Sequence, residues 1–126
     1  MRMITEGLQH TSTVQVSDAN VARTMGSGDL EIFATPSMVA LMENAAMHAV
    51  APHLPQESTT VGGFIETSHL APSPIGAIVS ATATLTEVNG RKLTFAIEAT
   101  EGNKLIGKAT HIRFIVDREQ FIQSLK

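Results

Sequence analysis

The chain has 126 residues, 43 % of them hydrophobic and 17 % charged, which is typical of one globular domain. Its net charge of -3 argues against nucleic acid as a partner, and the lack of cysteine excludes disulfides and thiolate chemistry. No stretch approaches the roughly 20 apolar residues that cross a bilayer, and the start, MRMITEGLQH, does not resemble a signal peptide. We therefore expect one cytoplasmic domain over residues 1–126, without a membrane partner.

The first expected element is a short strand over residues 11–17, TSTVQVS, where Val14 and Val16 share a face. In the segment that follows, residues 18–31, the alternation breaks down, and Gly26 and Gly28 suggest mobility. Such a segment, placed just before a long helix, is either a lid over a site or a plain connection.

The stretch FATPSMVALMENAAMHAVA, residues 33–51, predicts a long helix over residues 36–51. Pro36 suits the first helical position, and we expect the Thr35 hydroxyl to cap the first turn. Free N–H groups at this end would attract an anion or a developing oxyanion. The helix is apolar almost all round, so other elements should wrap it. Its one acidic residue, Glu43, is costly to bury unpaired and is therefore a functional candidate.

Two strands are expected next, over residues 59–69 and 77–88. Gly62 and Gly63 inside the first would allow a close approach to the backbone or mark a bulge. A hairpin should follow the second strand. We predict a three-residue loop over residues 88–90, because a two-residue Asn89-Gly90 loop would place the apolar faces of the two strands on opposite sides. This loop would pair Leu85 with Leu93 and Ala83 with Phe95.

After a turn at residues 101–104, the last strand is expected over residues 105–116. Its two faces are less distinct than those of the other strands, which suits the middle of a sheet or an oligomer contact. One face carries Ile106, Ile112, Phe114 and Val116, and the other carries Gly107, Ala109, His111 and Arg113. Asp117 should then cap a short amphipathic helix with Phe121, Ile122 and Leu125 on its apolar side.

This order of elements predicts an α+β domain in which an antiparallel sheet wraps one long helix. A single sheet covers only part of a helix that is apolar all round. We therefore expect a second subunit to supply the remaining cover, as in a homodimer; two dimers could associate further into a tetramer.

Four motifs together resemble a known family: FAT followed by MVALME, then GGFIETSHLAPSPIG, VNGRKL and IGKATHIR. From about residue 11 to residue 116 the chain resembles the hotdog-fold acyl-CoA thioesterases, within the group that includes fluoroacetyl-CoA thioesterase. The resemblance implies a hotdog fold, an acyl-CoA substrate, a site at a dimer interface, and no cofactor or metal beyond the coenzyme A of the substrate.

The resemblance also implies roles for single residues. Thr35, Glu43 and His69 match the catalytic set of the family. Gly62, next to Gly63, matches a glycine near the thioester carbonyl, and Arg113 matches a basic residue near the point where coenzyme A enters. The fluoroacetyl enzyme carries two aromatic lid residues before FAT, where this chain reads MGSGDLEI. The sequence therefore does not predict selectivity for a fluorinated acyl group.

Thioester hydrolysis needs a nucleophile, a base, oxyanion donors and an acid for the leaving thiolate. Glu43 suits a base toward water, or toward Thr35 if an acyl-enzyme forms. His69 suits the tasks of orienting the nucleophile, polarising the carbonyl or protonating the sulfur. Each also has a structural alternative: a cap for Thr35, a hydrogen bond to a strand for Glu43, and a surface position for His69. The remaining histidines suggest no metal site and are interpreted as structural or solvated: His48, His53 and His111.

Two other functions stay open at this stage. A hydratase or dehydratase of the same fold would use a carboxylate and a histidine to move protons at an acyl carbon. A non-catalytic module would bind acyl-CoA without turnover. Thr35 beside Glu43 favours hydrolysis over hydration.

Overall fold

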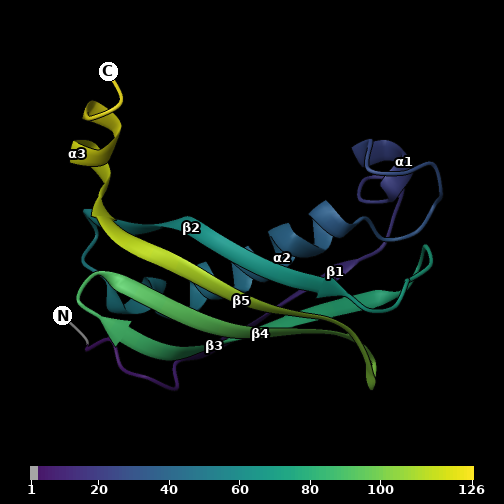
Figure 1. The fold of residues 1–126 in the computed structure, drawn as a ribbon, viewed down its shortest axis with the longest axis horizontal. Helices are drawn as coiled ribbons and strands as arrows, with labels where there is room; N and C mark the ends of the chain where they lie inside the picture. The colour runs from purple at the N-terminus through teal and green to yellow at the C-terminus, as the bar shows by residue number, and fades with distance from the viewer. Residues whose placement is uncertain (1–2) are drawn as a thin grey trace.

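The structure is a computed structural model that describes residues 3–126, and in it a curled antiparallel sheet wraps one long helix (Figure 1). The sheet has the strand order β1-β3-β4-β5-β2, so β1 and β2 are its edges. Helix α2 lies against the inner face. The elements are β1 (Gln9–Gln15), α1 (Ala22–Met25), α2 (Thr35–Val50), a 3-10 turn (Ala51–His53), β2 (Ser58–His69), β3 (Ile78–Asn89), β4 (Lys92–Glu101), β5 (Lys104–Asp117) and α3 (Arg118–Gln123). The predicted α+β architecture is confirmed. No helix within residues 3–126 is long and apolar enough to span a bilayer.

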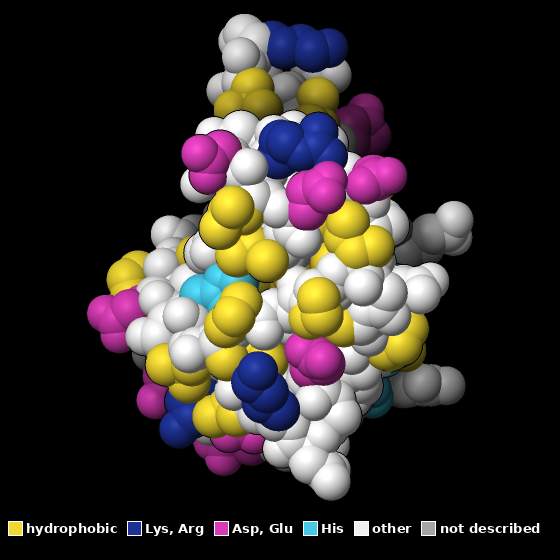
Figure 2. Space-filling view, turned by 90° about the vertical axis from the view of Figure 1, so that its right-hand side faces the viewer, with side chains coloured by type: hydrophobic (Ala, Val, Ile, Leu, Met, Phe, Trp, Pro, Cys, Tyr) yellow, Lys and Arg dark blue, Asp and Glu magenta, His cyan; other side chains and the backbone are white. Residues whose placement is uncertain are grey.

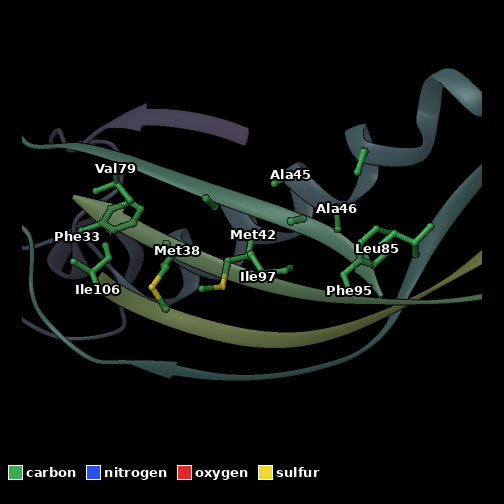
Figure 3. Close-up of a cluster of buried hydrophobic side chains, with 14 of the residues drawn as sticks. Phe33, Met38, Met42, Ala45, Ala46, Val79, Leu85, Phe95, Ile97 and Ile106 are labelled. Carbon is green, nitrogen blue, oxygen red and sulfur yellow. The ribbon is translucent and has the colours of Figure 1, made fainter. Parts of the chain in front are cut away.

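The core lies between α2 and the strands β3, β4 and β5 (Figure 3). Alternating residues of β3 and β4 point inward, as their sequence pattern predicts. Small alanines on α2 let the helix lie close to the sheet, and methionines fill the gaps that remain. The labelled core residues are Phe33, Met38, Met42, Ala45, Ala46, Val79, Leu85, Phe95, Ile97 and Ile106.

Helix α2 begins at Thr35 rather than after it. The N-cap is Ala34, which has no side-chain capping bond, so the prediction of Thr35 as the cap is wrong. The reason is that the Thr35 hydroxyl hydrogen-bonds to His69 instead. On the far side of the helix Ala40, Asn44 and His48 are exposed. The sheet of one chain therefore covers only part of α2.

The hairpin between β3 and β4 differs from the predicted one. Its loop has two residues, Gly90 and Arg91, and Leu85 pairs with Phe95 rather than with Leu93. Gly90 is left-handed as expected, with φ of 62°. The register shifts by one residue at Thr86, and this bulge brings the apolar faces back to the same side. One extra residue does align the two apolar faces, as predicted, but it lies within β3 and not in the loop.

Strand β5 turns the less apolar of its two faces toward the helix. Its inward residues Gly107, Ala109, His111 and Arg113 lie opposite the buried residues of β4. Gly107 is needed there, because a Cβ would lie 2.5 Å from Met38 Sδ. The apolar side chain of Phe114 is exposed on the outer face. The inner face of β5 therefore brings a histidine and an arginine under α2.

Helix α3 projects away from the sheet beside the end of β5 (Figure 1). Its predicted cap is confirmed, since the Gln120 N–H donates to Asp117 Oδ1 over 2.9 Å. The apolar stripe of this helix does not pack on the domain, because Phe121, Ile122 and Leu125 are all exposed.

Candidate active site

The first residue of α2 and the last residue of β2 meet at one end of the domain. Thr35 Oγ1 lies 2.7 Å from His69 Nδ1, at hydrogen-bonding distance. His69 Nε2 is buried and has no partner among residues 3–126. Burial also lowers the pKa of His69 from its ordinary value, which favours the neutral ring at pH 7. We call these two residues the Thr35 cluster.

A pocket of about 400 Å³ opens beside the Thr35 cluster. Its volume falls within the range of small-molecule sites. The walls come from α1 and the segment after it, the start of α2, and the loop after β2. The lining residues are Ala22, Ser27, Gly28, Asp29, Leu30, Ile32, Phe33, Thr35, His69, Leu70, Ala71 and Pro72. Figure 2 views this end of the molecule, where hydrophobic side chains gather around a histidine.

The segment expected to be either a lid or a connection forms one wall of this pocket. Its backbone is tied to the strand-like stretch before α2, because the Ala22 N–H donates to Ile32 O over 2.8 Å and the Arg23 N–H donates to Leu30 O over 3.0 Å. Leu30 is exposed at the pocket, together with Asp29. Residues 18–31 contain no aromatic side chain, so none lines the pocket from this segment.

Glu43 lies in a second cluster, around Gly62 on edge strand β2. A Cβ at Gly62 would lie 3.0 Å from Glu43 Oε2, 3.3 Å from His111 Cε1 and 3.5 Å from Arg113 Nη1. The register of β2 against β5 shifts between Gly62 and Phe64, so the two glycines form a bulge and also allow a close approach. We call Glu43, Thr60, Gly62, His111 and Arg113 the Gly62 cluster.

Each of the three nitrogens of the Arg113 guanidinium donates one hydrogen bond inside this cluster. Nε donates to Thr60 Oγ1 over 2.8 Å, Nη2 donates to Thr60 O over 3.0 Å, and Nη1 donates to His111 Nε2 over 3.2 Å. Burial lowers the pKa of Arg113, and the Glu43 carboxylate acts in the opposite direction. Only 7 % of the residue is exposed. Arg113 therefore lies beneath Gly62, facing Glu43, and not on an open surface.

His111 connects this arginine to the bulge of β2. The residue is fully buried, and its Nδ1–H donates to the Phe64 carbonyl over 2.7 Å. Because a carbonyl only accepts, Nδ1 carries the proton and Nε2 is left as the acceptor for Arg113. Burial lowers the pKa of His111, and the charge of Arg113 adds to this effect. The Phe64 hydrogen bond and Glu43 partly oppose it.

One chain thus holds the three predicted catalytic residues in two places. Thr35 and His69 are bonded to each other, whereas Glu43 accompanies Gly62 and Arg113. Thr35 and Glu43 are eight positions apart in α2, which corresponds to about 12 Å along the axis.

Sequence reasoning missed the parts played by His111 and Thr60. The available signal was the polar pair His111 and Arg113 on one face of β5, but the sequence did not say which face is inside. Among residues 3–126, no group of three histidine, aspartate or glutamate side chains is placed to hold a metal ion.

Comparison with known proteins identifies the family. The family described as fluoroacetyl-CoA-specific thioesterase matches residues 16–119. The chain belongs to this family. A relative named fluoroacetyl-CoA thioesterase, from Streptantibioticus cattleyicolor, is 41 % identical over 91 residues, which make up 72 % of this chain and 66 % of that protein.

Solved structures agree with this family. A point mutant of the fluoroacetyl-CoA-specific thioesterase in complex with fluoroacetate and CoA has a TM-score of 0.87 and 33 % identity, covering 94 % of this chain and 99 % of that one. A thioesterase superfamily member from Thermus thermophilus has a TM-score of 0.89 and 27 % identity, covering 99 % and 92 %. The chain therefore has a hotdog fold and is a member of a family of thioester hydrolases.

Proposed function

We propose that this protein hydrolyses a small acyl-CoA to the free acid and coenzyme A, without a metal. The observation that carries the proposal is the 2.7 Å contact between Thr35 Oγ1 and His69 Nδ1 at the start of α2, beside an open pocket. A hydroxyl bonded to a neutral imidazole is the arrangement of an activated nucleophile. A relative bound to fluoroacetate and CoA supports the substrate class.

In the proposed first step, the Thr35 hydroxyl attacks the thioester carbonyl and His69 takes its proton. The first turn of α2 has N–H groups without helical partners, and these suit the oxyanion that forms. The tetrahedral intermediate then expels the CoA thiolate, which receives the proton from His69. The acyl group is left as an ester on Thr35.

In the second step, a water molecule attacks this ester. A Glu43 carboxylate takes a proton from the water as the water oxygen bonds to the carbonyl carbon. When the tetrahedral intermediate breaks its bond to Thr35, Glu43 returns this proton to the Thr35 oxygen, so the free acid leaves and both side chains are restored. The net reaction consumes one water and releases one acid and one thiol. Glu43 of the same chain is about 12 Å from Thr35 along the helix, so we assign this role to Glu43 of a second copy.

The edge strand β2 offers the means to bring two copies together. It has 12 residues and an unpaired side in the isolated chain, and such an edge readily adds another strand. An antiparallel pair of β2 strands around a two-fold axis near Ile65 and Glu66 would place Gly62 of one copy opposite His69 of the other. The Thr35 cluster of one chain would then face the Gly62 cluster of its partner in a homodimer.

The test is release of free thiol from a panel of short acyl-CoAs by the parent, Glu43→Gln and His69→Ala. We expect a loss of at least about a hundredfold in kcat for each variant, the scale of general acid-base groups. Glu98→Gln and His10→Ala, at exposed positions on β4 and β1, are matched controls and should retain full activity. Circular dichroism verifies that all variants are folded.

Other outcomes would point elsewhere. Water addition to an enoyl-CoA without thiol release would indicate a hydratase. Tight acyl-CoA binding by the folded parent without any turnover would indicate a binding module. An ester on Thr35, trapped by rapid quenching and detected by mass spectrometry, would support the covalent route; turnover retained in Thr35→Ala would contradict it.

A further inference from the structure

Arg113 faces Glu43 but does not pair with it. Arg113 Nη1 and Glu43 Oε2 both lie within 3.5 Å of one point, the position that a Cβ would take at Gly62. Yet Arg113 and Glu43 do not form an ion pair. Within residues 3–126, the one ion pair with a nitrogen–oxygen distance of 4.0 Å or less joins Arg23 to Glu31. Arginine and a carboxylate form strong charge-assisted hydrogen bonds when they meet. Arg113 and Glu43 therefore face the same space beside Gly62 without a direct ion pair, and the other partners of Arg113 explain why.

The reason lies in the acceptors that Arg113 already has. Two of its three nitrogens donate to Thr60, one to the hydroxyl and one to the backbone carbonyl. Both bonds follow from the pairing of β2 with β5. The third nitrogen, Nη1, is the one nearest Gly62, and its acceptor is His111 Nε2 at 3.2 Å. One of the two N–H groups of Nη1 is thus bonded to His111, and this bond fixes the position of Nη1.

The surroundings of His111 keep its ring neutral, with the proton on Nδ1 and the lone pair on Nε2. Its Nδ1–H is engaged by the Phe64 carbonyl on β2, and the Phe95 ring on β4 lies 6.3 Å away. The charged groups near it are Glu43 on α2 and Arg113 on β5. A proton on Nε2 would point at the N–H of Arg113 and would place two positive charges in contact.

We propose that His111 is a positioning residue whose neutral Nε2 holds Arg113 Nη1 and keeps it from pairing with Glu43. Without that acceptor, Nη1 would turn toward Glu43 Oε2 and form an ion pair. A carboxylate paired with arginine is a weaker base, so Glu43 would no longer activate water. This last consequence rests on the proposed function, but the contact itself does not.

Three variants test the proposal by thiol release. His111→Leu removes the acceptor and should lower kcat by about tenfold to a hundredfold, within the scale of a lost base, with a smaller change in KM. His111→Gln keeps one donor and one acceptor on a neutral group and should stay within about threefold of the parent. Adding Arg113→Met to His111→Leu removes the competing cation and should restore at least part of kcat. A kcat of the double variant lower than that of His111→Leu, with all proteins folded, would overturn the proposal.

A second measurement needs no turnover. In protein labelled with 13C at the glutamate carboxyl carbon, the Glu43 resonance is assigned by its loss in Glu43→Gln. At pH 7 this resonance should have a different chemical shift in His111→Leu than in the parent, because Arg113 now hydrogen-bonds to the carboxylate. In His111→Gln its chemical shift should match that of the parent. An unchanged chemical shift in His111→Leu would overturn the inference, even if the parent hydrolyses no acyl-CoA.

Discussion

The two clusters of polar residues in this chain are built in opposite ways. The Thr35 cluster lies at the mouth of a pocket, and its His69 Nε2 has no partner within residues 3–126. In the Gly62 cluster, by contrast, Arg113 and His111 are buried and bonded through every nitrogen. The Thr35 hydroxyl, exposed beside a pocket, is placed to contact a substrate, whereas buried and hydrogen-bonded groups are placed to control a neighbouring charge. The comparison indicates that the Thr35 cluster contacts the substrate, and that His111 and Arg113 set the state of Glu43.

The largest expected effect comes from separating the two clusters onto different chains. Thr35→Ala and Glu43→Gln proteins should each be nearly inactive. If the clusters combine across two copies, mixing the two variants under conditions of subunit exchange should restore about a quarter of the parent activity, because half of the dimers carry one intact site.

If both clusters act within one chain, the mixture will stay as inactive as its components. Size-exclusion chromatography with light scattering establishes whether dimers are present. A mixture of Glu43→Gln with His111→Leu, prepared in the same way, provides a control. Both substitutions fall in the Gly62 cluster, so the two variants should not restore each other's activity.

A smaller effect should follow from filling the space at Gly62. In Gly62→Ala the new Cβ would lie 3.0 Å from Glu43 Oε2, so the carboxylate must move by a few tenths of an ångström. We expect kcat to fall by about tenfold, because the base loses its alignment, while the free energy of unfolding changes by less than about 1 kcal/mol. Kinetics and urea unfolding of the same protein test this. An unchanged kcat would indicate that Glu43 takes no part in the reaction.

The charge of Asp29 should affect selectivity more than rate. Asp29 lines the pocket beside the Thr35 cluster, and its carboxylate should repel an acyl group that carries its own negative charge. In Asp29→Asn we expect the ratio of kcat/KM for malonyl-CoA over acetyl-CoA to rise about three- to tenfold. Competition between the two substrates measures the ratio directly. An unchanged ratio would indicate that the acyl group does not occupy this pocket.

The smallest effect concerns stability at acidic pH. Burial lowers the pKa of both His69 and His111 in the folded chain below the ordinary value of 6.5. The unfolded chain therefore binds more protons between the folded values and 6.5, and the free energy of unfolding should fall as the pH drops below about 6.5. Urea unfolding at pH 7.5 and 5.5 measures the loss. His111→Gln should reduce it, and an equal loss in both proteins would contradict burial of a neutral His111.

Local sequence patterns were sufficient to predict the elements of the fold. The alternation in β3 and β4 identified their buried faces, and the apolar run after Pro36 identified α2 as the central helix. The Asp117 cap and the glycine bulge of β2 also follow from local chemistry, because capping and close backbone approach depend on one or two residues. Glu43 was selected because it is the one acidic residue of an apolar helix, whereas Thr35 and His69 were selected through the family resemblance.

Only the tertiary structure decided which of these residues meet. Thr35 hydrogen-bonds to a strand-end histidine instead of its own backbone, and the hairpin bulge lies inside β3. Of the apolar face of β5, Ile106 is buried in the core, whereas Phe114 is exposed on the outer face. Each outcome depends on contacts between residues far apart in sequence, and a local pattern cannot rank such contacts. The same reason explains why His111 looked like an ordinary strand residue, and why the family resemblance placed Arg113 near the coenzyme A entry rather than beneath Gly62. Their importance arises from Glu43 and Gly62, which α2 and β2 bring to within a few ångströms of them.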